Sequence, residues 1–408
     1  MTVNCSDPSP SDSLETRIGV VGMRLAHSLR GVLDELPGGP HRPNQLARLL
    51  SLNRDISGRV ISAARDSDPL TVTHVIPGPE PLRKLLRAAR RKSVSSDIIA
   101  DAEEAVQAFE RLIREVAGDR PSLDAIISSL LPDARVKFEL AAKQTTFKGT
   151  SLLKGAMADL WIHAALVHPS RQSPDFLDVT YVYGTLGLRR LRPNMVVKFT
   201  YRQFGVLTDK WVTLDGSLPS EAQGDELDQF CILPTAKLDA TQAGNGTIYA
   251  LAADVIGPAS AADKLLAEVH PAAMSRYALP RPRNKKSLFV APSVPVKLLN
   301  FDVLFHEEVF PGAEPGLVMY DTAVDGMASV NDPARDADRL DVRESITMLD
   351  RSRDALAFPE MPRYQDMLRH VCSKLNWDLA RFRGFRCRMQ YPMHGTQVCM
   401  AFNAPPAP

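Results

Sequence analysis

The residues best suited to chemistry in this chain are cations that follow one another closely in segment 82–92, LRKLLRAARRK. These cations are Arg83, Lys84, Arg87, Arg90 and Arg91, followed by Lys92, with no acidic residue between them. Like charges at helical spacing repel one another unless an anion lies nearby. A nucleic-acid backbone supplies such an anion, and each phosphate contact makes binding salt-dependent. A solvated basic face is the alternative interpretation of the same run.

The second group of candidate residues lies in segment 44–64, NQLARLLSLNRDISGRVISAA. Pro43 fits the first position of a helix, where its missing N–H costs nothing. Leu46, Leu49 and Leu50 then recur at helical spacing, and Asn53 can cap a second helix. The outward-facing side chains expected on this second helix are those of Arg54, Ser57, Gly58, Arg59 and Ser62.

Two short helices joined by a tight turn resemble the helix-turn-helix of bacterial winged helix-turn-helix transcriptional regulators. The resemblance covers residues 16–91, with Ser51 where the family turn usually has glycine. It implies that the second helix enters the major groove of double-stranded DNA and that its outward side chains contact bases. The cations of segment 82–92 would then hold phosphates. A plain two-helix corner within a helical domain is the alternative.

The segments around this pattern complete the expected domain, residues 14–92. Apolar residues at spacings of three and four predict a helix over residues 14–36. The run 66–78 is rich in β-branched residues, and Leu70 to Val75 is where the strand of a wing is expected. Residues 1–13 predict a disordered tail, and residues 93–131 predict a helical connector that joins domains or forms a dimer.

The rest of the chain, residues 132–403, predicts an α+β domain for ligand sensing or dimerisation. Residues 151–168 are apolar almost all round and predict a buried helix, with His163 and His168 in the core. Period-two alternation predicts strands from Asp178 onward, joined as an antiparallel sheet, with a short helix over residues 260–269. The last strands expected are 385–391 and 398–402, with an apolar and a polar face.

Composition sets the limits of these predictions. The chain has 408 residues, 44% hydrophobic and 24% charged, and a net charge of +1, so DNA binding requires a local patch. The five cysteines form no C-x-x-C pair and fit reduced thiols in the cytoplasm. No apolar run is long enough to span a membrane. No nucleotide-binding, hydrolase or zinc-protease motif occurs, so no catalytic residue, metal or cofactor is expected.

Two functions follow from these patterns. The first is a cytoplasmic DNA-binding transcriptional regulator, for which the family resemblance implies a homodimer and a small-molecule effector. The second is a ligand-binding protein or enzyme whose helix-turn-helix is a structural corner or a protein-docking module. The second is motivated by the large β-rich part, which makes up more than half of the chain.

Overall fold

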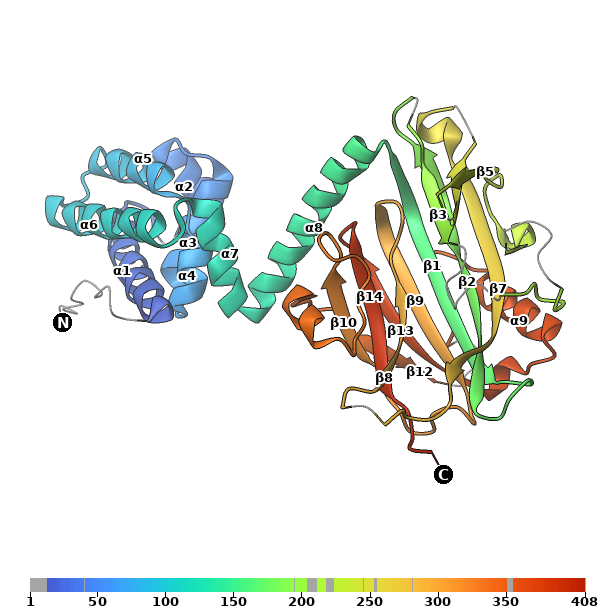
Figure 1. Cartoon of the computed structure of the whole chain (residues 1–408). Helices are drawn as coiled ribbons and strands as arrows, with labels where there is room; N and C mark the ends of the chain where they lie inside the picture. Colours follow the sequence, from blue (N-terminus) through green and yellow to red (C-terminus); the bar gives the residue numbers. More distant parts are fainter. Residues whose placement is uncertain are drawn as a thin grey trace. The chain divides into compact units, whose positions relative to one another are not determined.

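The computed structural model describes residues 13–39, 41–193, 195–203, 211–217, 224–244, 246–252, 255–280, 282–350 and 355–407. The chain divides into two compact units, Met1–Glu139 and Leu140–Pro408. The first unit is helical and the second is built on β-sheets (Figure 1). The α+β composition expected from the sequence is therefore confirmed. The predicted tail, residues 1–13, lies almost wholly outside the described residues.

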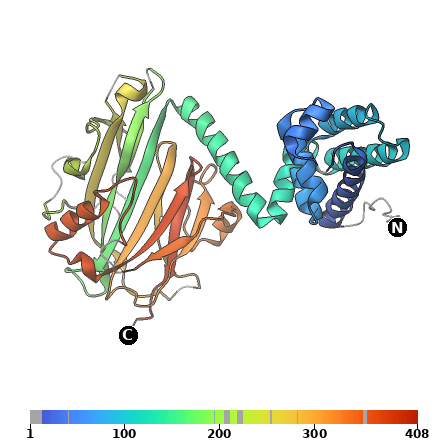
Figure 2. The same cartoon turned by 180° about the vertical axis from the view of Figure 1, so that it is seen from behind.

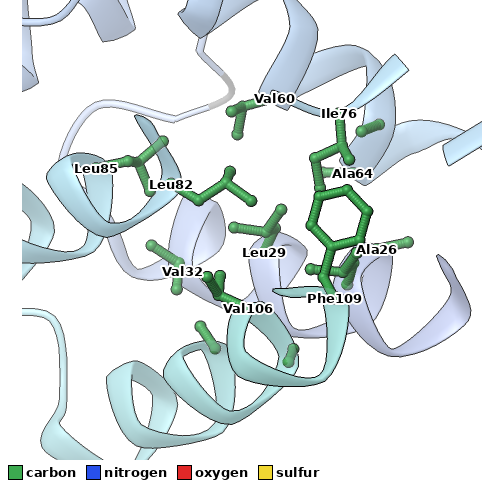
Figure 3. Close-up of a cluster of buried hydrophobic side chains, with 14 of the residues drawn as sticks. Ala26, Leu29, Val32, Val60, Ala64, Ile76, Leu82, Leu85, Val106 and Phe109 are labelled. Carbon is green, nitrogen blue, oxygen red and sulfur yellow. The ribbon is translucent and has the colours of Figure 1, made fainter. Parts of the chain in front are cut away.

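The helical unit is a bundle around one apolar core. Its elements are α1 (Leu14–Glu35), α2 (Pro43–Leu50), α3 (Arg54–Arg65), α4 (Pro69–Val75), α5 (Pro79–Arg90), α6 (Ser96–Leu112), the π-helical turn η1 (Ile113–Ala117), α7 (Arg120–Leu130) and the start of α8 (Pro132–Lys154). Leu29 of α1, Val60 of α3, Leu82 of α5 and Phe109 of α6 meet in this core (Figure 3). Leu123 of α7 belongs to it as well, so residues 93–131 share one core with residues 14–92.

The crossing of α1 and α4 is unusually close. A Cβ atom built on Gly22 of α1 would lie 2.1 Å from the carbonyl oxygen of Pro69 in α4. Only glycine allows the two backbones to approach this far. Val72 and Thr73 of α4 are buried beside α1, and the Thr73 hydroxyl donates to the Pro69 carbonyl.

The sheet unit is layered. Its strands are β1 (Ala156–Pro169), β2 (Phe176–Arg190), β3 (Lys198–Gln203), β4 (Asp225–Glu226), β5 (Leu238–Ala243), β6 (Gly246–Leu251), β7 (Ala262–Ser275), β8 (Lys285–Val290), β9 (Val296–His306), β10 (Gly316–Asp321), β11 (Arg339–Leu340), β12 (Ile346–Leu349), β13 (Phe382–Gln390) and β14 (Thr396–Asn403). Short 3-10 turns η3 (Asp228–Phe230), η4 (Gly257–Ser260), η5 (Pro333–Asp338) and η6 (Leu379–Arg381) lie between them.

A seven-stranded sheet of order β12-β13-β9-β1-β2-β7-β4 forms the middle layer. A four-stranded sheet, β11-β10-β14-β8, packs on one of its faces through Phe301, Phe385 and Phe402. Helix α9 (Tyr364–Lys374) packs on the other face (Figure 2). Leu304 of β9 and Met367 of α9 belong to one core there. The small sheet β3-β6-β5 supplies Phe199, which stacks on Trp161.

A buried charge pair fastens α9 to the middle sheet. The Arg386 guanidinium donates to both oxygens of Asp302, at 2.9 and 2.7 Å. The Tyr364 hydroxyl of α9 donates to the same carboxylate at 2.7 Å. Asp302 and Tyr364 are both fully buried, and burial raises the pKa of Tyr364 well above its usual value. The hydrogen bonds satisfy the buried carboxylate, which would otherwise be costly to desolvate.

Several sequence expectations are wrong in this unit. Residues 151–168 do not form one buried helix, because α8 ends at Lys154 and β1 begins at Ala156. Gly155 between them has φ +68°, a left-handed conformation that ends helices. Residues 260–269 contain the start of β7 and no α-helix, and the middle sheet is mixed because β1 pairs with β9 in parallel. The strands expected at 385–391 and 398–402 are confirmed as β13 and β14.

Candidate nucleic-acid interface

The two helices and tight turn expected over residues 44–64 are confirmed as α2 and α3. Pro43 is the first residue of α2, and the Asn53 side chain accepts the Asp55 N–H to cap α3. Ser51 ends α2 in the left-handed region, with φ 56°. It therefore takes the conformation that favours glycine at this place in the turn.

Three of the expected base-facing residues share one outward stripe of α3. Arg54 and Ser62 are exposed, and Gly58 between them is half-buried. The spacing of four residues places them on the same face, one turn apart. Arg65, which was not among the residues predicted from the sequence, continues the stripe and is exposed too. The i, i+4, i+8, i+11 spacing from Arg54 was the signal that could have found it.

The other two expected base-facing residues point elsewhere, so that part of the prediction is wrong. Ser57 is completely buried and its hydroxyl donates to the Asn53 carbonyl at 3.0 Å. Arg59 is half-buried, and its guanidinium donates to the carbonyls of Val75 and Ile76 at 2.7 and 2.9 Å. The helix is rotated so that Ser57 faces the core on the side of Val60, while Arg59 faces α4.

The strand expected for a wing over Leu70 to Val75 is also wrong, because these residues form helix α4. Pro69 starts this helix, and the Asp68 carboxylate accepts the Thr71 N–H at 2.9 Å. The hydrogen bonds from Thr71 lower the pKa of Asp68. Capping and packing against α1 thus outweigh the strand preference of the β-branched residues.

The carbonyls at the end of α4 join three helices. Arg120 of α7 donates to the carbonyls of Thr73 and His74 at 2.8 and 2.9 Å, and more distantly to that of Ile76 at 3.3 Å. Arg59 of α3 shares the Ile76 carbonyl. Cations near a helix C-terminus satisfy its free carbonyls and oppose its dipole. Arg59 is therefore a structural residue that links α3 to α4.

The cations of α5 divide into paired and unpaired groups. Arg83 pairs with Glu110, and Arg90 pairs with Glu103 at 3.0 Å, so α6 neutralises two of them. Lys84, Arg87 and Arg91 are exposed, and within the described residues none of them forms an ion pair. Lys92 beyond the helix is exposed in the same way.

Acidic groups near this surface are few but present. Asp55 lies beside Arg54 at the start of α3 and is exposed, and Glu80 occupies the first turn of α5. The exposed groups of α3 named here carry two cations against one acid. On α5 and just after its C-terminus, the four unpaired cations Lys84, Arg87, Arg91 and Lys92 stand against one acidic residue, Glu80. The exposed groups of α3 and α5 named here are therefore net cationic, although the chain as a whole has a net charge of only +1.

Other chemistry-bearing residues of the sequence lie in structural settings. His306 is buried, while Glu307 and Glu308 both pair with Arg381, at 2.7 and 3.1 Å. His163 lies on β1 among Tyr181, Tyr183 and Phe301, and burial lowers its pKa to about 4. Among the described residues, no group of three His, Cys, Asp or Glu side chains could hold a metal ion. Burial raises the pKa of Cys372, Cys387 and Cys399 to about 12.

The chain matches no protein-family model, no curated protein and no solved structure. No helix in the described part of the chain is long and apolar enough to cross a membrane.

Proposed function

We propose that the helical unit binds double-stranded DNA and that the chain is a DNA-binding regulator. The observation that carries the proposal is the set of exposed, unpaired cations Lys84, Arg87 and Arg91 on the same compact unit as a helix-turn-helix. Three neighbouring cations without a counter-charge repel one another. A phosphate backbone relieves that repulsion and gains entropy from the counterions it releases.

The outward stripe of α3 supplies the base contacts in this proposal. Arg54 and Arg65 carry long donors suited to guanine, and Ser62 can donate to or accept from either kind of base pair. Gly58 between them lies against Pro43 of α2, because a Cβ atom built on it would be 3.8 Å from the proline ring, and it offers no side chain to the bases. Ser57 and Arg59 have no part in base contact here, since one is buried and the other caps α4.

The remaining expectations belong to the same proposal. The proposed resemblance to helix-turn-helix regulators is supported by α2, the turn at Ser51 and α3, whereas helix α4 occupies the position at which a strand of the wing was expected. The sheet unit would sense a small-molecule effector or hold two copies of the chain together. A homodimer would read two half-sites about 34 Å apart.

Fluorescence anisotropy of the full-length protein with labelled duplex DNA tests the proposal. The double variant Lys84→Gln/Arg87→Gln should weaken binding at least about tenfold, since it removes two phosphate contacts. The matched control is Arg111→Gln/Arg114→Gln, which removes the same charge from exposed positions of α6 and η1. Absence of binding at micromolar protein, or an equal loss in both variants, would refute the proposed surface.

A further inference from the structure

A hollow of about 430 Å³ opens on the α9 face of the middle sheet, at the ends of four adjacent strands. Its floor is a straight row across these strands. Its members, in order across the sheet, are Leu186 of β2, Leu160 of β1, Leu298 of β9 and Gln390 of β13, and each is the register partner of the next. Three strand spacings make this row about 14 Å long, with an apolar body and an amide at one end.

The wall at the apolar end of the row is fixed in place. Asp263, buried to 1% exposure, accepts the main-chain N–H groups of Gly187, Ile232 and Leu233, each at 2.8 Å. The loop held in this way presents Ile232 at 63% and Leu233 at 37% exposure. Large apolar side chains on an anchored loop form a preorganised contact surface, which lowers the entropic cost of binding.

The opposite end of the row is rich in donors. Arg388 and Gln390 are exposed there, and the Gln390 amide forms no hydrogen bond within the described residues. Arg388 pairs with Glu360, but a guanidinium has five N–H donors and can serve a second carboxylate. Asn300, the register partner of Arg388, is fully buried with neither amide atom bonded in the described part of the chain.

The carboxylates of the hollow are already engaged. The oxygens of Asp263 accept three main-chain N–H groups, and Asp159 lies between Arg189 and Lys297, the latter at 2.7 Å. Glu360, the third carboxylate in the lining, pairs with Arg388 through one of its oxygens. A ligand anion still finds spare donors on Arg388 and Gln390, and both lie at the donor end of the row. The hollow is also of the size that small-molecule sites have.

We propose that this hollow binds an elongated carboxylate, with its hydrocarbon chain along the leucine row and its carboxylate on Arg388 and Gln390. The inference goes beyond DNA binding and does not depend on it, because every residue concerned lies in the sheet unit.

Isothermal titration calorimetry of the full-length protein with octanoate tests the inference, with 1-octanol and octylammonium as matched ligands. Octanoate should bind at one site, about tenfold tighter than either of the other two, as expected for a charge-assisted hydrogen bond to an arginine. Arg388→Gln should abolish that preference. Ile232→Ser should weaken octanoate and octanol alike, by several-fold.

The control variant is Arg283→Gln. Arg283 pairs with Asp336 and has a side-chain exposure of 41%, close to the 44% of Arg388, but it does not line the hollow. It should leave octanoate binding unchanged. No octanoate binding at millimolar concentration, equal affinity for the three ligands, or equal effects of the Arg388 and Arg283 variants would overturn the inference. None of these outcomes depends on whether the helical unit binds DNA.

Discussion

Replacing Arg59 tests whether this residue stabilises the helical unit or contacts DNA. Arg59→Met keeps the aliphatic stem but removes two donors from the end of α4, to the carbonyls of Val75 and Ile76. A hydrogen bond from a charged donor contributes about 1.5–3 kcal/mol. Arg120 still reaches the Ile76 carbonyl at 3.3 Å, so only the Val75 carbonyl loses its side-chain donor. We therefore expect a loss of about 2 kcal/mol, toward the low end for a half-buried site.

A loss of that size should lower the melting temperature of the helical unit by about 5–10 °C. Circular dichroism at 222 nm on the full-length protein measures it, because the helices dominate that signal. Arg54→Met is the matched control, since Arg54 is exposed and forms no hydrogen bond within the described residues. It should change stability by less than about 0.5 kcal/mol and yet weaken DNA binding. An unchanged melting temperature for Arg59→Met, together with a loss of DNA selectivity, would show that Arg59 contacts bases after all.

Three further changes have defined outcomes. Gly22→Ala should destabilise the helical unit by at least about 1–3 kcal/mol in urea unfolding, because its Cβ would meet the carbonyl of α4. Asp302→Ala should cost about 3–5 kcal/mol of sheet-unit stability, measured by near-ultraviolet circular dichroism, because Arg386 loses its buried partner. Burial lowers the pKa of His163 from 6.5 to about 4, so the unfolded chain gains its proton first. The free energy of unfolding should therefore fall by up to about 3 kcal/mol as the pH drops from 6.5 to about 4. The variant His163→Phe should abolish this pH-dependent loss of stability.

Local signals in the sequence were sufficient to predict the two short helices α2 and α3 and the turn between them. Pro43, the leucines of α2 and the Asn53 cap lie within a single short segment, so their spacing reveals both helices. Local signals also gave a wrong prediction for residues 70–75, where a strand was expected. The run after Asp68 favours a strand by composition, but its cap and its packing against Gly22 make it helical. That close crossing depends on a residue almost fifty positions earlier.

Pairing over long distances explains the other differences. Residues 156–169 are apolar on both sides because β1 lies in the middle of a sheet that is covered on both faces. A strand buried on both faces has no alternation, and its sequence cannot be distinguished from that of a buried helix. Gly155 was the local sequence signal for the boundary between α8 and β1. In the structure it adopts φ +68°, a conformation that favours glycine.

The candidate interface shows the same division. The sequence identified the cations of α5 but not which of them are neutralised, because Glu103 and Glu110 belong to a later helix. It identified the outward stripe of α3 only in part, since the rotation of that helix depends on its contacts with α4. The hollow in the sheet unit left no local pattern, because its floor combines single residues from four strands.

The most direct test of DNA binding by the cations of α5 is the salt dependence of duplex DNA affinity for the wild type and for Lys84→Gln/Arg87→Gln/Arg91→Gln. Each phosphate contact contributes about 0.9 to the slope of log affinity against log salt concentration. We expect the triple variant to reduce the magnitude of that slope by about 2–3, while its fold is retained. A wild-type affinity that does not change with salt, or identical slopes for the two proteins, would contradict DNA binding by this surface.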